Sequence, residues 1–298
     1  MLHPDRRQLQ GYQQDWIRHP AAHGMQVKAG RCAGDKVPCL FVAPDRNAGP
    51  QERGRALRKQ LAKANSALRP YGETQGILVL LHGRSGRKED LLPIAERFVA
   101  AGFKCVIPDL PAHGDNKLDN ALFATAPFER DLAARVLADA RAYFNERDSP
   151  AGVWGISMGG AFAIKAVSQS TDTWKAAVIV SSFDSLEGVV EDKLAFLPGS
   201  LSALLRISLG IMTDVRGDLI LKEVHPDVWA KRVTTPVLVA HGDRDQVISL
   251  KRGRRLFDSL PGKNKSWLLV SGATHRNVLT TSAPLYSGMS KWFIAHVR

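Results

Sequence analysis

Residues 153–160 read Val-Trp-Gly-Ile-Ser-Met-Gly-Gly, so that an apolar run ends in a Gly-x-Ser-x-Gly pattern. A helix-compatible stretch, Ala161 to Gln169, follows directly. A serine hydroxyl is a useful nucleophile only when it is raised clear of its neighbours, beside a base and beside donors for a developing negative charge. A sharp strand-to-helix turn meets these needs, and glycine suits its flanking positions because it has no Cβ to collide there. The pattern therefore predicts a nucleophile elbow with Ser157 at its tip.

From residue 76 onward, apolar runs alternate with helix-compatible segments. This alternation is typical of a mostly parallel, twisted sheet with helices on both faces, so the predicted fold class is α/β. The expected strands are 77–81, 105–108, 152–155, 177–181, 237–240 and 267–270. The expected helices are 88–101, 127–145, 158–169, 250–260 and 283–297. Ligands of such sheets bind at the carboxyl ends of the strands, where Ser157 would lie.

Residues 1–75 are expected to form an N-terminal extension of a core that spans 76–298. The extension comprises an irregular stretch over 1–23, two hairpin strands over 25–32 and 37–42, and a basic amphipathic helix over 51–69. We expect this helix to pack on the edge of the domain, with contact to an anionic membrane or a partner as the alternative. The interval 183–233 has no clear strand, and we expect an inserted helical cap there, with extra helices on the rim as the alternative.

Two further segments carry the groups that a serine nucleophile requires. Asp243 and Asp245 follow the expected strand 237–240, and His275 follows the expected strand 267–270. A histidine can take the hydroxyl proton, and a carboxylate can orient that histidine and stabilise it once charged. Asp243 and Asp245 compete for the role of the acid, and Asp243 is suited to holding a turn by accepting backbone hydrogen bonds.

Together with His82-Gly83-Arg84 after an early strand, these motifs resemble the α/β-hydrolase superfamily of serine hydrolases, which includes esterases and lipases. The resemblance runs from about residue 82 to the C-terminus, and the chain order serine, acid, histidine is the one found in that superfamily. It implies that the acid is Asp245, the third residue after the His241-Gly242 pair. It also implies an α/β-hydrolase fold.

The resemblance further implies that the backbone amides of Arg84 and Met158 hold the oxyanion of the transition state. The segment 109–114 is similar to a structural Asp-x-Arg-Gly-x-Gly motif of the superfamily, with Pro111-Ala112 in place of Arg-Gly. His82, His113 and His241 lie beside glycines of these motifs, and we interpret them as structural.

The predicted function is hydrolysis of a small-molecule carboxylic ester through an acyl-serine intermediate. Peptide or amide hydrolysis, thioester hydrolysis and acyl transfer use the same triad and stay open as alternatives, as does a non-catalytic binding protein. A peptidase acting on a free amino terminus would need an acidic anchor, for which Glu187, Glu191 and Asp192 are the candidates. The apolar stretch 194–211 predicts instead an apolar acyl pocket over the elbow.

No cofactor or metal is expected, because residues 83–86 match no nucleotide-binding fingerprint and the histidines lack zinc-protease spacing. The net charge of +12 is spread along the chain without a nucleic-acid-binding motif, so we expect no specific nucleic acid partner. The absence of a long apolar run and of a signal-peptide pattern favours a cytoplasmic location. Cys32, Cys39 and Cys105 are expected as free, buried thiols, with pairing of Cys32 and Cys39 across a hairpin in an oxidising compartment as the alternative. The sequence leaves the oligomeric state open.

Overall fold

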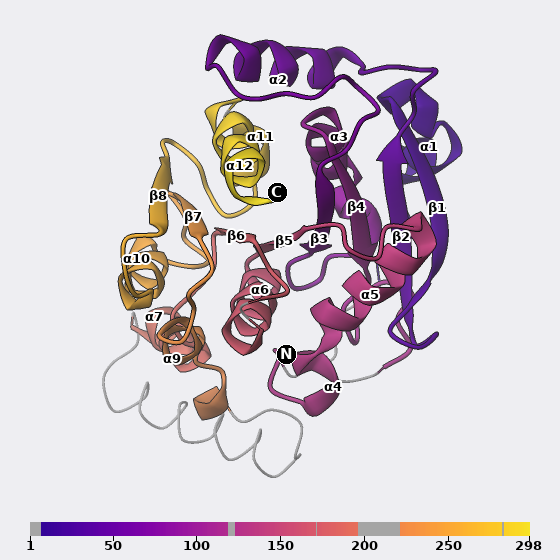
Figure 1. Cartoon of the computed structure of the whole chain (residues 1–298). Coiled ribbons are helices and arrows are strands. Elements are labelled where there is room, and N and C mark those ends of the chain that lie inside the picture. The colour runs from indigo at the N-terminus through magenta and orange to yellow at the C-terminus, as the bar shows by residue number, and fades with distance from the viewer. Residues whose placement is uncertain (1–6, 119–122, 171, 196–220, 282) are drawn as a thin grey trace.

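The computed structural model describes residues 7–118, 123–170, 172–195, 221–281 and 283–298. These residues form an eight-stranded sheet with the order β1-β2-β4-β3-β5-β6-β7-β8 (Figure 1). The strands are β1 (Met25–Cys32), β2 (Val37–Pro44), β3 (Gly76–Leu81), β4 (Phe103–Pro108), β5 (Ala151–Ile156), β6 (Ala176–Val180), β7 (Val237–Gly242) and β8 (Lys265–Val270). β2 is antiparallel to β1 and to β4, and the other neighbouring pairs are parallel.

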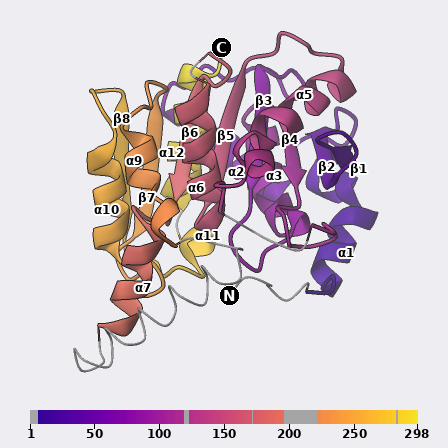
Figure 2. The ribbon, with the colours of Figure 1, turned by 90° about the horizontal axis from the view of Figure 1, so that it is seen from below.

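Helices cover both faces of the sheet, as Figures 1 and 2 show from two directions. One face carries α5 (Leu132–Phe144), α6 (Met158–Gln169), α7 (Leu186–Leu194), α9 (Pro226–Ala230) and α10 (Leu250–Ser259). The other face carries α2 (Glu52–Lys63), α3 (Leu92–Ala100) and α12 (Ala283–His296). The shorter elements are α1 (Gly11–Arg18), α4 (Pro127–Arg130), α11 (Val278–Thr281) and the 3-10 turns η1 (Pro20–His23), η2 (Lys88–Leu91) and η3 (Leu221–Glu223).

The central strand β3 shows why its sequence is apolar at every position. Ile77, Val79 and Leu81 pack against the α5 and α6 side, whereas Leu78 and Leu80 pack against the α3 and α12 side. All five side chains are fully buried. Because successive residues of a strand point to opposite faces, a strand that is covered on both faces needs no polar alternation. The predicted α/β-hydrolase fold is confirmed.

The prediction of an irregular stretch over residues 1–23 is wrong, since α1 and η1 lie there. Gln13 is only 1% exposed, and the Trp16 side chain is buried and stacks on His23 with ring centroids 3.5 Å apart. The segment is polar in sequence, and tertiary contacts of a few side chains stabilise its helix. Intrinsic propensity is a weak guide where such contacts form.

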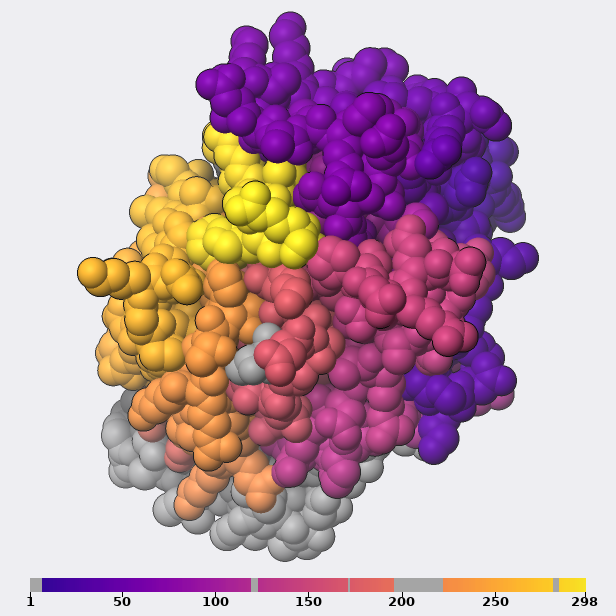
Figure 3. All heavy atoms as spheres, viewed as in Figure 1, coloured from indigo at the N-terminus to yellow at the C-terminus, as the bar shows by residue number. Residues whose placement is uncertain are grey.

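The basic helix α2 lies against α3 and α12, where its surface meets that of the C-terminal helix (Figure 3). Leu57 and Leu61 are buried in this contact. Arg58 reaches across it and donates to the carbonyl of Ala100 at 2.9 Å. The helix is shorter than the predicted 51–69, because the chain turns at Asn65, which has a left-handed backbone with φ of 52°. Membrane contact through this helix stays a prediction.

Within 183–233 the structure describes α7, η3 and α9, and the inserted cap stays a prediction. From residue 196 onward, the apolar stretch 194–211 lies outside the described residues. The prediction of an apolar acyl pocket concerns that stretch, so it also falls outside the described residues.

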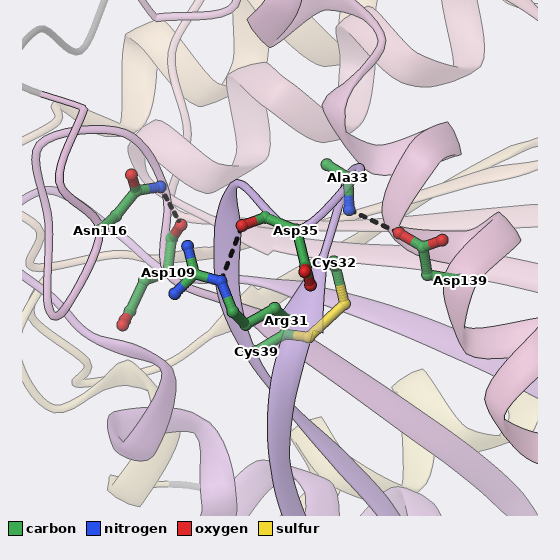
Figure 4. Close-up of a disulfide and its surroundings, with 8 residues drawn as sticks. All are labelled: Arg31, Cys32, Ala33, Asp35, Cys39, Asp109, Asn116 and Asp139. Carbon is green, nitrogen blue, oxygen red and sulfur yellow. Dashed lines mark hydrogen bonds between the residues drawn. A yellow bond between two sulfur atoms is a disulfide. The ribbon is translucent and has the colours of Figure 1, made fainter.

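The prediction of free thiols is wrong for Cys32 and Cys39, which form a disulfide across the β1–β2 hairpin (Figure 4). The hairpin pairs Cys32 with Val37 and Gly30 with Cys39, so the two cysteines are diagonal neighbours with Cα atoms 6.2 Å apart. This separation lies within the range that a disulfide spans. Cys105 is free and buried, as predicted.

We expect the double variant Cys32→Ser/Cys39→Ser to lose about 2 kcal/mol of unfolding free energy, because the cross-link no longer restricts the unfolded chain. Urea denaturation with and without reductant measures this loss. Reductant should shift the midpoint of the wild type toward that of the double variant and leave the variant unmoved. Titration of the denatured, unreduced wild type should find one thiol, and a result of three would contradict the disulfide.

Candidate active site

Ser157 forms the turn between β5 and α6, with a φ of 54° and a ψ of −118°. Positive φ is costly for a residue with a Cβ, so neighbouring contacts must hold this turn. Its amide donates to the Val180 carbonyl at 2.9 Å, and its carbonyl accepts from the Gly160 amide and the Ser182 hydroxyl, each also at 2.9 Å. The backbone of β6 and the first turn of α6 therefore hold Ser157 in this conformation.

The two glycines of the Gly-x-Ser-x-Gly pattern allow the turn to pack tightly. A Cβ on Gly155 would lie 2.1 Å from the carbonyl oxygen of Gly159. A Cβ on Gly159 would lie 2.1 Å from the carbonyl oxygen of Leu81, at the end of β3. Both contacts are with backbone atoms, which have little room to move aside. Only glycine allows α6 to start this close to β3 and β5.

The fold brings Ser157, His275 and Asp245 together from three separate loops. His275 Nδ1 lies 2.8 Å from Asp245 Oδ2, and His275 Nε2 lies 3.1 Å from Ser157 Oγ. A carboxylate only accepts hydrogen bonds, so Nδ1–H donates to Asp245. In the neutral ring, Nε2 then carries a lone pair and faces the serine hydroxyl. The arrangement can remove a proton from Ser157.

Asp245 lies in a setting that keeps its side chain ionised. The side chain is fully buried, and its second oxygen accepts from the amides of Val247 at 2.9 Å and Ile248 at 2.8 Å. Burial alone would raise the pKa of this carboxyl, but the hydrogen bond and charge of His275 and the Ile248 amide outweigh it. The pKa of Asp245 therefore lies below its ordinary value.

Asp243, the competing acid, does not contact the His275 ring. Its carboxylate accepts from the Gly272 amide at 2.7 Å and from the Ser271 hydroxyl at 3.4 Å. It thus joins the loop after β7 to the loop after β8, the loop that carries His275. The sequence predicted that Asp243 holds its own turn, whereas the structure shows its carboxylate bonding to the neighbouring loop.

Two buried histidines support the loops around the site. His241 lies behind Asp245, with Nε2 3.0 Å from the Ile248 carbonyl, and burial lowers the pKa of its ring. His82 Nε2 accepts from the Leu110 amide at 3.0 Å, so Nδ1 carries the proton and donates to the Gly83 carbonyl at 2.8 Å. His82 is thereby fixed as the neutral Nδ1–H tautomer, and it binds the loop after β3 to the loop after β4.

The amides of Arg84 and Met158 are the candidate donors to an oxyanion. A Cβ on Gly83 would lie 3.4 Å from the Ser157 Cβ, so the loop after β3 runs beside the serine. Met158 is the first residue of α6, and amides at a helix N-terminus are available to anions. Within the part of the chain that the structure describes, neither amide donates to a protein acceptor.

The sequence did not predict a buried cluster of charged side chains next to the loop after β3. Lys88 Nζ lies 2.8 Å from Asp109 Oδ2 and 2.9 Å from Glu89 Oε1, and it also contacts Asp115. Asp109 further accepts from the Lys88 amide at 2.7 Å and the Asp115 amide at 2.9 Å. The only signal in the sequence was the match of 109–114 to a structural motif, which did not indicate a partner for Asp109.

The acidic residues proposed as an ammonium anchor are mostly paired. Asp192 accepts from Arg252 Nη2 at 2.8 Å, from Arg252 Nε at 3.0 Å and from the Ser249 hydroxyl at 2.7 Å. Glu191 lies 3.5 Å from Arg252. The Arg252 guanidinium and the Ser249 hydroxyl lower the pKa of Asp192 despite its partial burial. Glu187, on the same helix, is half-buried.

One groove among the described residues lies away from Ser157. It has a volume of about 1120 Å³ and is lined by β1, β2, the start of β4 and the end of α5, including Phe41, Lys104 and Tyr143. The start of β4 lies at the opposite end of the sheet from the loops that carry Ser157 and His275. This groove therefore does not define a substrate pocket for the site.

Comparisons with known proteins agree on the class of the chain. A family model described as "Serine aminopeptidase, S33" matches residues 72–214. Among solved structures, the esterase Pf2001 of Pyrococcus furiosus has a TM-score of 0.67 at 14% identity, with 99% of this chain and 100% of that chain covered. A cold-adapted esterase from an Arctic intertidal metagenomic library has a TM-score of 0.54 at 18% identity, with 92% and 94% covered.

The acylaminoacyl peptidase of Pyrococcus horikoshii has a TM-score of 0.64 at 15% identity, and the match covers 98% of this chain and 44% of that one. No curated protein sequence matches the chain. The solved structures show the α/β-hydrolase fold, and the family match over residues 72–214 is consistent with a serine hydrolase of that superfamily. At these identities the structural likenesses show the fold and leave the substrate open.

We expect stability to fall as the pH is lowered from about 6.5 to about 4. Burial lowers the pKa of His82 from 6.5 to about 4, so in this window the unfolded chain binds a proton that the folded chain does not. The effect of His82 alone reaches about 3 kcal/mol. Urea midpoints between pH 7 and pH 4 measure the loss, and NMR titration of the ring assigns it. A His82 ring that titrates near 6.5 would contradict this account.

Proposed function

We propose that the protein hydrolyses carboxylic esters of small molecules through a Ser157-His275-Asp245 triad. The observation that supports this most is the position of the His275 ring, which is hydrogen-bonded to the Ser157 hydroxyl on one side and to the buried Asp245 carboxylate on the other. A nucleophile, a base and a group that orients the base are the parts that acyl transfer requires.

In the proposed reaction, Ser157 Oγ attacks the carbonyl carbon while His275 Nε2 takes the hydroxyl proton. The carbonyl oxygen becomes negatively charged and accepts from the amides of Arg84 and Met158, and losing one such donor typically costs about 3 to 4 kcal/mol of transition-state stabilisation. His275 then gives its proton to the departing alkoxide, which leaves an acyl-serine. Water attacks this intermediate by the same steps and regenerates the free hydroxyl. Asp245 stabilises the imidazolium throughout.

The comparisons support a hydrolase, and two of the similar structures are described as esterases. A serine peptidase or amidase is the second candidate, because the matching family model is described as a serine aminopeptidase. The pairing of Asp192 and Glu191 with Arg252 argues against these two as the anchor, since the arginine already occupies carboxylate oxygens that a substrate ammonium would need. Glu187 is the candidate to which this argument does not apply. Thioester hydrolysis and acyl transfer would use the same groups. The apolar acyl pocket stays a prediction.

The cytoplasmic location also stays a prediction. In the described part of the chain, no helix is both long and apolar enough to cross a membrane. The Cys32–Cys39 disulfide argues against a cytoplasmic location, because such pairings persist mainly in oxidising compartments.

A panel of p-nitrophenyl esters from acetyl to octanoyl, measured beside aminoacyl p-nitroanilides, tests the proposed reaction. We expect larger kcat/KM values for the esters, and we expect Ser157→Ala to abolish both turnover and labelling by a fluorophosphonate without changing the melting temperature. His275→Ala should be nearly as damaging, because triad members act as a unit. Faster cleavage of the anilides would favour the peptidase, and undiminished turnover by Ser157→Ala would refute the serine mechanism.

The acid is tested by a matched pair of substitutions in one loop. Asp245→Asn should lower kcat by about 10⁴-fold, because an amide in place of the carboxylate no longer holds the His275 tautomer that the reaction needs. Asp243→Asn should lower kcat far less, since its carboxylate bonds only to the loop after β8. Steady-state kinetics and circular dichroism of both variants check this. If Asp243→Asn is folded and loses more kcat than Asp245→Asn, then Asp243 is the catalytic acid and Asp245 has the structural role.

A further inference from the structure

We propose that Arg7 positions the oxyanion loop, residues 83–86, from outside the catalytic core. The inference rests on the proposed function, because it concerns the loop that contributes the Arg84 amide. Arg7 belongs to the N-terminal segment, which lies 78 residues before Ser85 in the chain. In this proposal it is a positioning residue that acts through the backbone of the loop.

The oxyanion loop is a tight turn with a strained residue in it. The Gly86 amide donates to the Gly83 carbonyl at 3.0 Å, which closes the turn around Arg84 and Ser85. Ser85 has a left-handed backbone with φ of 59°. A non-glycine residue in this region costs about 1 kcal/mol or more, so contacts outside the turn are needed to keep the conformation.

Arg7 supplies such a contact at the strained residue. Its Nε donates to the Ser85 carbonyl at 2.7 Å, and its Nη2 lies 2.6 Å from Asp90 Oδ2. The backbone of Arg7 is also held, because Arg87 Nη1 donates to the Arg7 carbonyl at 2.7 Å. Both ends of the residue are therefore tied to the segment that follows β3.

Asp90 links this contact to the buried part of the N-terminal helix. Gln13 is almost fully buried and donates from Nε2 to Asp90 Oδ1 at 2.5 Å. The Arg87 amide donates to Asp90 Oδ2 at 3.0 Å. The Asp90 carboxylate thus accepts hydrogen bonds from Arg7, Gln13 and Arg87. These bonds fix the position of the N-terminal segment relative to the oxyanion loop.

The loop is held from two sides, with the proposed oxyanion donor between them. On the inner side, the neutral ring of His82 donates to the Gly83 carbonyl at 2.8 Å. On the outer side, Arg7 accounts for the contact at Ser85. Loss of Arg7 would leave the Gly83 end fixed and release the Ser85 end. The Arg84 amide would then spend less time in the orientation that an oxyanion needs.

Arg7→Ala tests the proposal in the full-length enzyme. We expect kcat for p-nitrophenyl butyrate to fall about tenfold with KM unchanged, which is less than the roughly 10²- to 10³-fold loss that follows complete removal of an oxyanion donor. Inhibition by phenylboronic acid, whose tetrahedral adduct places an oxygen in the same hole, should weaken by a similar factor. Arg7→Lys keeps the charge but lacks the forked guanidinium, and it should fall between Arg7→Ala and the wild type.

Arg18→Ala is the matched control, because Arg18 is an exposed arginine at the end of α1, the helix that follows Arg7, and it has no partner among the described residues. It should match the wild type in kcat and in boronate affinity. If Arg7→Ala lowers only the melting temperature and leaves both readouts unchanged, the positioning role is overturned while a Ser157-dependent esterase still stands. If Ser157→Ala keeps its activity, the proposed function itself fails, whatever Arg7→Ala shows.

Discussion

The positive φ of Ser157 is the constraint on which the rest of the site depends. Such a conformation persists only where the surrounding structure holds it. Here the Ser157 amide donates to the Val180 carbonyl of β6. The Ser157 carbonyl accepts from the Gly160 amide in the first turn of α6 and from the Ser182 hydroxyl in the loop after β6. The pairing of β5 with β6 in the middle of the sheet therefore supports the serine turn.

Around this turn, loops at the carboxyl edge of the sheet are joined by buried polar contacts. Lys88 and Asp109 join the segments after β3 and β4, His82 joins the same two loops, and Asp243 joins the loops after β7 and β8. Burying charges is expensive unless they are paired and hydrogen-bonded. Such contacts fix the relative position of loops that no regular secondary structure connects, and a site that assembles parts of several loops depends on that precision.

The β1–β2 hairpin and the N-terminal segment, which lie outside the parallel part of the sheet, also contact loops at its carboxyl edge. The β1–β2 hairpin is closed by the Cys32–Cys39 disulfide, and the Pro38 carbonyl accepts from the Asp109 amide at 2.8 Å. The Ala33 amide of the same hairpin donates to Asp139 of α5 at 2.5 Å (Figure 4). The N-terminal segment, through Arg7 and Gln13, contacts the loop after β3. Both N-terminal elements thus reach the loops at the carboxyl edge next to Ser157.

The sequence by itself determined the fold class and predicted Ser157 and His275, while it left Asp243 and Asp245 as competing acids. The continuous apolar runs of buried strands, the Gly-x-Ser-x-Gly turn and the order of Ser157, Asp245 and His275 are local signals, and local signals can be read without coordinates. Only the tertiary structure decided that Asp245 faces the histidine, that α1 exists, that Cys32 pairs with Cys39 and that Arg7 contacts Ser85. These outcomes depend on which distant groups meet. A polar segment such as residues 7–18 carries no periodic apolar pattern that would reveal its partners, because hydrogen bonds and ion pairs are set by geometry in three dimensions.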